Sequence, residues 1–276
     1  MAIKIAKSTG IYEAFSIEKV KKSLRKAGAT DEQIQAICEK LESVMPKIKS
    51  TGDLYKFVID YMRSVDSVVA SRYNLKYALM ELGPAGYPFE TFVSKIFKYR
   101  GYHVELNRVV QGFCVDHEVD FIAKKEGERI YVECKFHNRR GLKSDVKVAL
   151  YVKARFDDIK RGLKKMGNKE IQRSLIVTNT NFTSEAIKYA ECVGFEMLDW
   201  NYPISQSLPD IINKLGMHPV TTLTSLNRRQ KKELIKNGFV LCRQAKENKK
   251  LLAGLGLTTH HIKKIIAESR ALCGIV

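Results

Sequence analysis

The sequence has few acidic residues, only one tryptophan and six prolines among its 276 residues, and no long hydrophobic run. No stretch approaches the roughly 20 consecutive apolar residues of a transmembrane helix, and the first residues lack the apolar core of a signal peptide. The six cysteines form no CxxC pair, which argues against a zinc site and for reduced thiols. We therefore expect a cytoplasmic protein that does not enter a membrane.

A GxxxxGKS/T loop, the usual phosphate-binding motif of ATP-hydrolysing enzymes, is also missing, as are internal repeats. The length and the hydrophobic content of 45% are sufficient for two or three globular domains. Clusters of glycine and proline near residues 83–88 and 216–219 indicate two joints. We predict three domains, which comprise residues 1–83, 84–217 and 218–276.

The shortage of acidic residues leaves a formal net charge of +18. Half of this excess lies in residues 220–276, which contain 12 basic and 3 acidic residues. A polyanionic partner such as DNA is the simplest reason for this distribution, and a solubilising surface is the alternative. The cations expected to contact DNA open the first helical pattern of this segment and are Arg228, Arg229, Lys231 and Lys232.

The most informative stretch is 118–137, where two apolar-rich runs flank a polar connection with Gly127. The runs at 119–123 and 130–136 predict the two strands of a β-hairpin. Alternate residues of a strand share one face, so the second strand has an apolar face and a charged face. The apolar face consists of Ile130, Val132, Cys134 and Phe136.

The charged face carries Glu133 and Lys135, and the neighbouring strand supplies Asp120. Carboxylates from two adjacent strands suit a cation that prefers oxygen ligands, such as Mg²⁺ or Mn²⁺. A lysine beside this cation can orient a water molecule and stabilise charge that develops on a phosphate oxygen. The pattern therefore predicts a hydrolytic metal site, whereas an ordinary exposed charge pair is the alternative.

Asp120 followed by Glu133-Cys134-Lys135 resembles the D…ExK motif of PD-(D/E)XK nucleases. The pattern at 89–93 and 101–104 is similar to the opening helix and first strand of Mrr-type restriction endonucleases and archaeal Holliday-junction resolvases. The resemblance covers roughly residues 84–200 and ends in a strand, a helix and a strand. It implies a central α/β restriction-endonuclease-like fold with a mixed sheet.

This resemblance also implies roles for the site residues. Asp120 and Glu133 would hold the metal, and Lys135 would position the attacking water. Glu90, in the opening helix, would either complete the ligand set or support it. The expected reaction is hydrolysis of a DNA phosphodiester bond that leaves a 5′-phosphate.

Residues 3–82 resemble a second family. Strands at Ile3–Lys7 and Tyr12–Phe15 around a turn at Gly10 precede a helical bundle, with helix starts expected at Ser16 and Thr30. This order is similar to the ATP-cone, a regulatory domain of ribonucleotide reductases and their repressors. The later helices are expected at Asp53–Met62 and Val65–Leu82.

The resemblance to the ATP-cone implies that the domain binds ATP or dATP. The chain has Ser8 where that family has an arginine. A glycine turn lets backbone amides approach an anion, and lysines can hold phosphates as point charges. The candidate nucleotide-binding residues are Lys7, Gly10, Glu13 and Lys19.

The basic C-terminal segment is expected to be α-helical, with helices at Leu226–Ile235, Val240–Leu252 and His260–Leu272. The glycine-rich turn at Leu252–Thr258 is similar to a helix–hairpin–helix turn that contacts DNA phosphate, and a plain pair of helices is the alternative.

Together these features predict a Mg²⁺-dependent DNA endonuclease, regulated by an adenine nucleotide and forming a homo-oligomer, with a dimer favoured. Two alternatives remain. One is a non-catalytic, nucleotide-responsive DNA-binding or regulatory protein on a nuclease-like fold. The other is a transcriptional regulator like the ATP-cone repressors, although the cysteine-rich zinc ribbon of those repressors is missing from this sequence.

Overall fold

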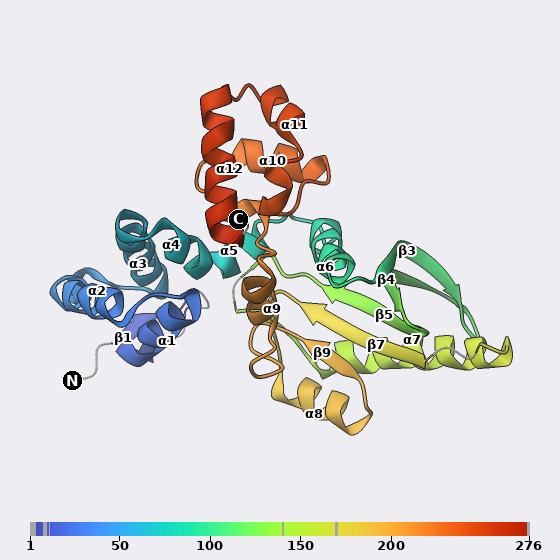
Figure 1. Ribbon diagram of the computed structural model, residues 1–276. Coiled ribbons are helices and arrows are strands. Elements are labelled where there is room, and N and C mark those ends of the chain that lie inside the picture. Colours follow the sequence, from blue (N-terminus) through green and yellow to red (C-terminus); the bar gives the residue numbers. More distant parts are fainter. Residues whose placement is uncertain (1–3, 8–9, 11, 140, 169–170, 275–276) are drawn as a thin grey trace.

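The computed structural model describes residues 4–7, 10, 12–139, 141–168 and 171–274. Figure 1 shows an N-terminal group of helices, a central sheet with its helices, and a C-terminal group of helices. Within the described ranges, none of the helices has both the length and the apolar character required to cross a bilayer. Four positions in the expected N-terminal hairpin lie outside the described residues: Ile3, Ser8, Thr9 and Ile11.

The N-terminal group begins with the expected antiparallel hairpin, followed by helices. Thr30 and Gln33 form the expected capping box, and Ser50 and Asp53 form a second one that the sequence analysis did not identify. Ser16 stands at the helix start as expected, but its side chain makes no capping hydrogen bond. The elements are β1 (Lys4–Ala6), β2 (Tyr12–Ala14), α1 (Ile17–Ala27), α2 (Asp31–Val44), the 3₁₀ turn η1 (Met45–Lys47) and α3 (Thr51–Val65).

The single helix expected at Val65–Leu82 is wrong, because the chain breaks it into α4 (Ser67–Tyr73) and α5 (Leu75–Met80). The Asp66 carboxylate accepts hydrogen bonds from the backbone N–H groups of the first turn of α4 and caps it close to the predicted start. The interruption lies at Asn74, the residue between α4 and α5. The side chains of Leu75, Leu79 and Leu82 then pack into the core of the central domain. Helix α5 therefore joins the N-terminal group to the sheet.

The central domain has a mixed sheet, as the resemblance implies, and helices cover both faces of this sheet. Its strand order is β3-β4-β5-β7-β9, in which β3, β4 and β5 are antiparallel and β5, β7 and β9 are parallel. The strands are β3 (His103–Gln111), β4 (Asp116–Lys125), β5 (Glu128–Lys135), β7 (Ile171–Thr178) and β9 (Glu196–Leu198), and a small second pair is β6 (Lys143–Ser144) with β8 (Asn181–Phe182). The helices are α6 (Tyr87–Tyr99), α7 (Val146–Lys165), α8 (Ser184–Cys192) and α9 (Leu208–Leu215).

Both faces of β5 are buried. Ile130 and Val132 pack in one cluster with α6 and α9, while Tyr131 packs against Phe156 of α7 on the opposite face, with ring centroids 6.2 Å apart. Helix α7, which the sequence analysis did not predict, therefore covers the face that carries Glu133. The charged face of the hairpin is thus a largely enclosed wall rather than a solvated surface.

The β3–β4 hairpin fixes the position of α7. A Cβ atom on Gly162 would lie 2.6 Å from the carbonyl carbon of Gly112, so the helix and the hairpin are in direct backbone contact. The Asp158 carboxylate accepts a hydrogen bond from the backbone N–H of Cys114 and lies 2.9 Å from His117 Nε2. The hydrogen bond with His117 lowers the pKa of Asp158 to about 2. These contacts set which residues of α7 reach the sheet.

The C-terminal group is helical, but the helix expected at Val240–Leu252 is wrong. Val220 donates its N–H to the carbonyl of Val240, and Cys242 donates its N–H to the carbonyl of His218. This strand-like pairing occupies the carbonyl of Val240, which in a helix beginning there would accept the N–H of Gln244. The elements are η2 (Val220–Thr222), α10 (Arg228–Lys236), η3 (Cys242–Ala245), α11 (Lys249–Gly254) and α12 (Thr259–Cys273).

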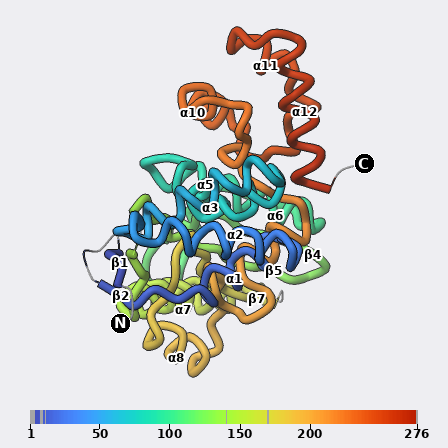
Figure 2. Tube along the Cα trace, turned by 90° about the vertical axis from the view of Figure 1, so that its left-hand side faces the viewer, coloured from blue at the N-terminus to red at the C-terminus, as the bar shows by residue number. Residues whose placement is uncertain are grey.

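The C-terminal group packs on the N-terminal group through α5. Figure 2 shows α10, α11 and α12 together at one end of the molecule, with α5 below α10. The Thr221 hydroxyl donates a hydrogen bond of 2.6 Å to the carbonyl of Ala78. A cleft remains where α10 faces α5 and the linker that follows it.

Candidate active site

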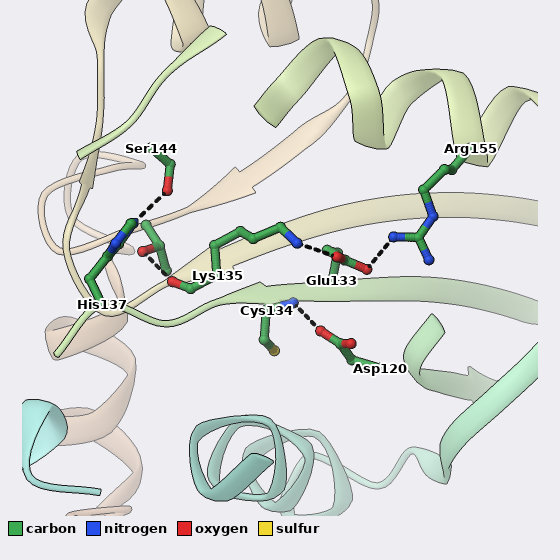
Figure 3. A network of polar contacts seen from close by, with 8 residues as sticks. Asp120, Glu133, Cys134, Lys135, His137, Ser144 and Arg155 are labelled. Atoms are coloured by element: carbon green, nitrogen blue, oxygen red, sulfur yellow. Dashed lines mark hydrogen bonds and ion pairs between the residues drawn. The ribbon is translucent and has the colours of Figure 1, made fainter. Parts of the chain in front are cut away.

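The four residues predicted to form the site converge at one place in the central domain. Glu90 stands in the first turn of α6, Asp120 in β4, and Glu133 and Lys135 near the end of β5. Burial is the main cause of the raised pKa of Glu90, and the negative charges of Asp120 and Glu133 raise it further, so the three carboxylates lie within electrostatic reach of one another. Figure 3 shows the Asp120, Glu133 and Lys135 side chains on the two neighbouring strands.

Asp120 stands where β4 and β5 separate. Backbone pairing of these strands extends from Lys125↔Glu128 to Phe121↔Val132. Beyond this point the Asp120 carboxylate accepts the backbone N–H of Cys134 at 2.6 Å, in place of a main-chain acceptor. The hydrogen bond fixes the carboxylate beside β5. Cys134 itself is a core residue as expected, and burial raises the pKa of its thiol.

Glu133 is only 5% exposed and is held by two cations. Lys135 Nζ lies 2.5 Å from one carboxylate oxygen, and Arg155 Nη1 from α7 lies 3.1 Å from the other. A carboxylate oxygen has two lone pairs, so each oxygen can still accept a further partner. Arg155 was not predicted from the sequence, since it stands 22 residues from Glu133 and belongs to no motif that could have identified it.

The two other carboxyl groups of the cluster have raised pKa values, and burial is the main cause for both. Burial, together with the charge of Glu133, raises the pKa of Asp120 to about 6. Burial and the charges of Asp120 and Glu133 raise the pKa of Glu90 to about 7. A divalent cation beside these groups would favour their ionised forms, and carboxylate oxygens are the ligands that Mg²⁺ and Mn²⁺ prefer. The donor set therefore fits Mg²⁺ or Mn²⁺.

The carboxylates are not yet arranged as a closed coordination shell. In the part of the chain that the structure describes, no group of three or more His, Cys, Asp or Glu side chains could hold a metal ion as it stands. Mg²⁺ is commonly held by only one or two carboxylates, with water and phosphate oxygens as its other ligands, so Asp120 and Glu133 would be sufficient as protein ligands.

The raised pKa values predict that the metal-free protein loses stability as the pH rises from about 4 to about 7. The folded protein binds these protons more tightly than the unfolded chain, in which the ordinary pKa values are 3.8 for Asp and 4.5 for Glu. The stabilisation is complete below those values and is lost as the pH passes the folded values. Thermal unfolding in EDTA should show a smaller decline for Glu90→Gln than for the wild type, and saturating Mg²⁺ should reduce the decline in the wild type. Parallel pH curves for the two proteins in EDTA would contradict the expectation.

The end of β5 is anchored by polar residues at the end of β7. The Thr178 hydroxyl donates to the carbonyl of Lys135 at 2.7 Å. The Asn179 side chain accepts the backbone N–H of His137 and donates to its carbonyl, both at 2.8 Å. These bonds hold the backbone that carries Lys135. The sequence pattern at this strand end indicated the strand, but not this role.

The four cations predicted to bind DNA do not all have the same surroundings. Arg228, Lys231 and Lys232 of α10 line the cleft beside α5, which has a volume of about 920 Å³, whereas Arg229 is not among its lining residues. Lys231 is partly buried and donates to the carbonyl of Thr221 at 2.8 Å, and burial lowers its pKa. The other two cations of the cleft, Arg228 and Lys232, are exposed and available to a polyanion.

Three of the candidate nucleotide-binding residues lie in contact, but their charged groups already pair with one another. Glu13 forms ion pairs with both Lys7 and Lys19, and the hydrogen bonds from these lysines lower its pKa to about 2. Gly10 has a φ of +81°, as expected for the turn. The adjoining cavity is lined by Glu13 and Lys19 and has a volume of about 180 Å³, below the roughly 300 Å³ of typical small-molecule sites.

Taken together, a mixed sheet with this cluster of carboxylates and a lysine defines a restriction-endonuclease-like protein. The family described as "Restriction endonuclease" matches residues 84–200, and the family described as "AF1548-like, C-terminal" matches residues 218–273.

Matches over a greater part of the chain give the particular family. A protein of Archaeoglobus fulgidus, called "Uncharacterized protein", is 32% identical over 183 residues, which are 66% of this chain and 100% of that protein. The crystal structure of AF1548, a protein of unknown function, has 33% sequence identity and a TM-score of 0.55, covering 69% of this chain and 99% of that one. The chain belongs to this AF1548-like family, and its central domain is restriction-endonuclease-like.

Proposed function

We propose that this protein is a metal-dependent DNA endonuclease. The observation that carries the proposal is the cluster of Glu90, Asp120 and Glu133 beside Lys135, in which burial and mutual repulsion keep the pKa of two carboxyl groups raised. A purely structural charge pair between Glu133 and Lys135 would not require two further carboxylates within reach. The match of residues 84–200 to the restriction endonuclease family supports the same conclusion.

Each residue of the cluster would have a separate role in the reaction. Asp120 and Glu133 would hold Mg²⁺ or Mn²⁺, and Glu90 would complete or support this set. The bound cation would supply positive charge to the phosphate and lower the pKa of a water molecule. Lys135 would position the attacking water, while Arg155 holds the carboxylate of Glu133 in place from α7. The products would carry a 5′-phosphate, as in the nucleases that the chain resembles.

A panel of labelled DNA substrates tests the proposal directly. Duplex, flap, junction and single-stranded DNA are incubated with the full-length protein in Mg²⁺, in Mn²⁺ and in EDTA. We expect cleavage of at least one substrate with either metal and none in EDTA. Binding without cleavage of any substrate would favour the alternative, a non-catalytic DNA-binding or regulatory protein on the same fold. Mass measurement in the same buffers would test the homodimer that we also propose.

A second proposal concerns nucleotide regulation and is based on the grouping of Lys7, Glu13 and Lys19. We propose that ATP or dATP binds at this position by displacing Glu13 from the two lysines. Substitution Glu13→Gln would then free both ammonium groups for phosphate and increase nucleotide affinity by about two- to fivefold, the range of one exposed ion pair. Lys19→Gln would decrease the affinity by a similar factor.

Titration calorimetry of the full chain with ATP and dATP measures both effects. Lys22→Gln is the control, because Lys22 is exposed on the same helix and is not among the residues that line this cavity. Absence of binding at millimolar nucleotide would end the proposal. Nucleotide binding without a change in cleavage rate or in subunit mass would leave the domain without the regulatory role.

A further inference from the structure

The cleft between α10 and α5 combines two kinds of surface. Its volume is about 920 Å³, and the linker that follows α5 and the loop that follows β5 complete its walls. One part is apolar and includes Met80, Leu82, Tyr87, Pro88 and Ile235. The other part is cationic and consists of Arg139, Arg228, Lys231, Lys232 and Lys236, with Glu81 as the only carboxylate among the lining residues.

The cleft adjoins the candidate active site. Ala85 and Tyr87 line the cleft, and Gly86 stands between them. A Cβ atom on Gly86 would lie 3.0 Å from Glu90 Oε1 and 3.9 Å from the Cβ atom of Phe136. The carboxylate of Glu90 therefore reaches back to the same short segment that forms one wall of the cleft. A DNA strand at the carboxylates can place a neighbouring nucleotide in the cleft.

We propose that this cleft binds an unpaired nucleotide of the DNA strand that lies in the active site. The inference rests on the proposed nuclease function. The base would pack against the apolar wall, with Tyr87 as its exposed aromatic partner, and the phosphates would lie on the cations of α10. The volume lies within the range of sites that enclose a nucleotide-sized ligand. A paired base inside a duplex cannot reach such a wall, because the neighbouring base pairs stack on it.

The combination of apolar and cationic lining residues fits an unpaired nucleotide better than a duplex backbone or a small apolar ligand. A groove that only follows a duplex backbone requires cations and polar donors but no enclosed apolar wall. A small apolar ligand would not require five cations around it. An unpaired nucleotide has both an apolar base and a charged phosphate, and unpaired bases typically stack on aromatic side chains next to basic grooves.

Binding measurements in EDTA separate this inference from the cleavage reaction. The probes are fluorescent duplexes that are fully paired, or that contain one extrahelical adenine, or that contain an abasic unit at the same bulge. We expect the adenine bulge to bind about tenfold more tightly than both other duplexes. Tyr87→Ala should remove this preference, and Tyr87→Phe should retain it. Tyr99→Ala is the control, because Tyr99 is an exposed tyrosine on the same helix that does not line the cleft.

The binding measurements can support or overturn nucleotide binding in the cleft independently of DNA cleavage. Equal affinity for the adenine and abasic bulges would overturn it, even if the protein cleaves DNA. Competition by free dAMP at micromolar concentration, without any preference among the duplexes, would assign the cleft to a free nucleotide and would also overturn it. A preference that depends on Tyr87 in a protein that cleaves no DNA would support the cleft and reject the nuclease function.

Discussion

The substitutions Asp120→Asn, Glu133→Gln and Lys135→Met should each reduce the rate of DNA cleavage by at least about 10³-fold. A thousandfold loss corresponds to about 4 kcal/mol of transition-state stabilisation, the scale expected for loss of charge at a metal-assisted site. Single-turnover cleavage of the best substrate in the panel, at saturating Mg²⁺, measures the effect. Glu118→Gln is the matched control, because Glu118 is an exposed carboxylate on the same strand as Asp120.

The Glu133 variant requires a check of its fold. Glu133 is buried and pairs with both Lys135 and Arg155, so its loss leaves two cations without their carboxylate. Removing one partner of a buried ion pair can cost about 3–5 kcal/mol of folding stability. Thermal unfolding and circular dichroism must therefore show a folded variant at the assay temperature. Cleavage at the wild-type rate by all three folded variants would eliminate the proposed site.

Neutralising the exposed cations of the cleft should weaken DNA binding and make it less sensitive to salt. Each phosphate contact that is lost reduces the slope of log affinity against log salt by about one unit. The double variant Arg228→Gln/Lys232→Gln should therefore lower the slope by about two units. Lys231 is left intact because it donates to the carbonyl of Thr221 and contributes to the packing of α10.

Arg229→Gln is the control for this experiment. Arg229 has the same charge and lies on the same helix, but it does not line the cleft. We expect a smaller change in slope for Arg229→Gln than for either single variant of the cleft cations, measured by fluorescence anisotropy over a range of salt concentrations. An unchanged slope in the double variant would mean that the positive charge of α10 is a solvated surface without contact to DNA.

The sequence by itself determined the elements that depend on local patterns. Alternation along 119–123 and 130–136 predicted the hairpin, and the same alternation placed Glu133 and Lys135 on one face, where the structure has them. The cap at Thr30 was also predictable, since capping involves residues only three apart in sequence. Such signals act within one element and need no knowledge of what packs against it.

Local patterns were insufficient where tertiary packing competed with them. The apolar spacing at Val65–Leu82 and Val240–Leu252 predicted long helices. The chain interrupts the first helix at Asn74, between α4 and α5, and pairing with His218 and Val220 prevents a helix in the second segment. Helical spacing alone cannot indicate this pairing, because Val220 and His218 lie 20 and 24 residues before their partners Val240 and Cys242.

Only the tertiary structure decided how the site is completed. Arg155 reaches Glu133 because the backbone contact of Gly162 with Gly112 and the bonds of Asp158 to the hairpin fix the register of α7 across the sheet. The cleft beside Glu90 arises in the same way, from the packing of α10 against α5 through Thr221. Contacts of this kind join residues that are distant in sequence, and their geometry depends on how whole elements pack. The sequence therefore identified the carboxylates and the lysine, while the packing of the elements decided which cation supports them and what surface lies beside them.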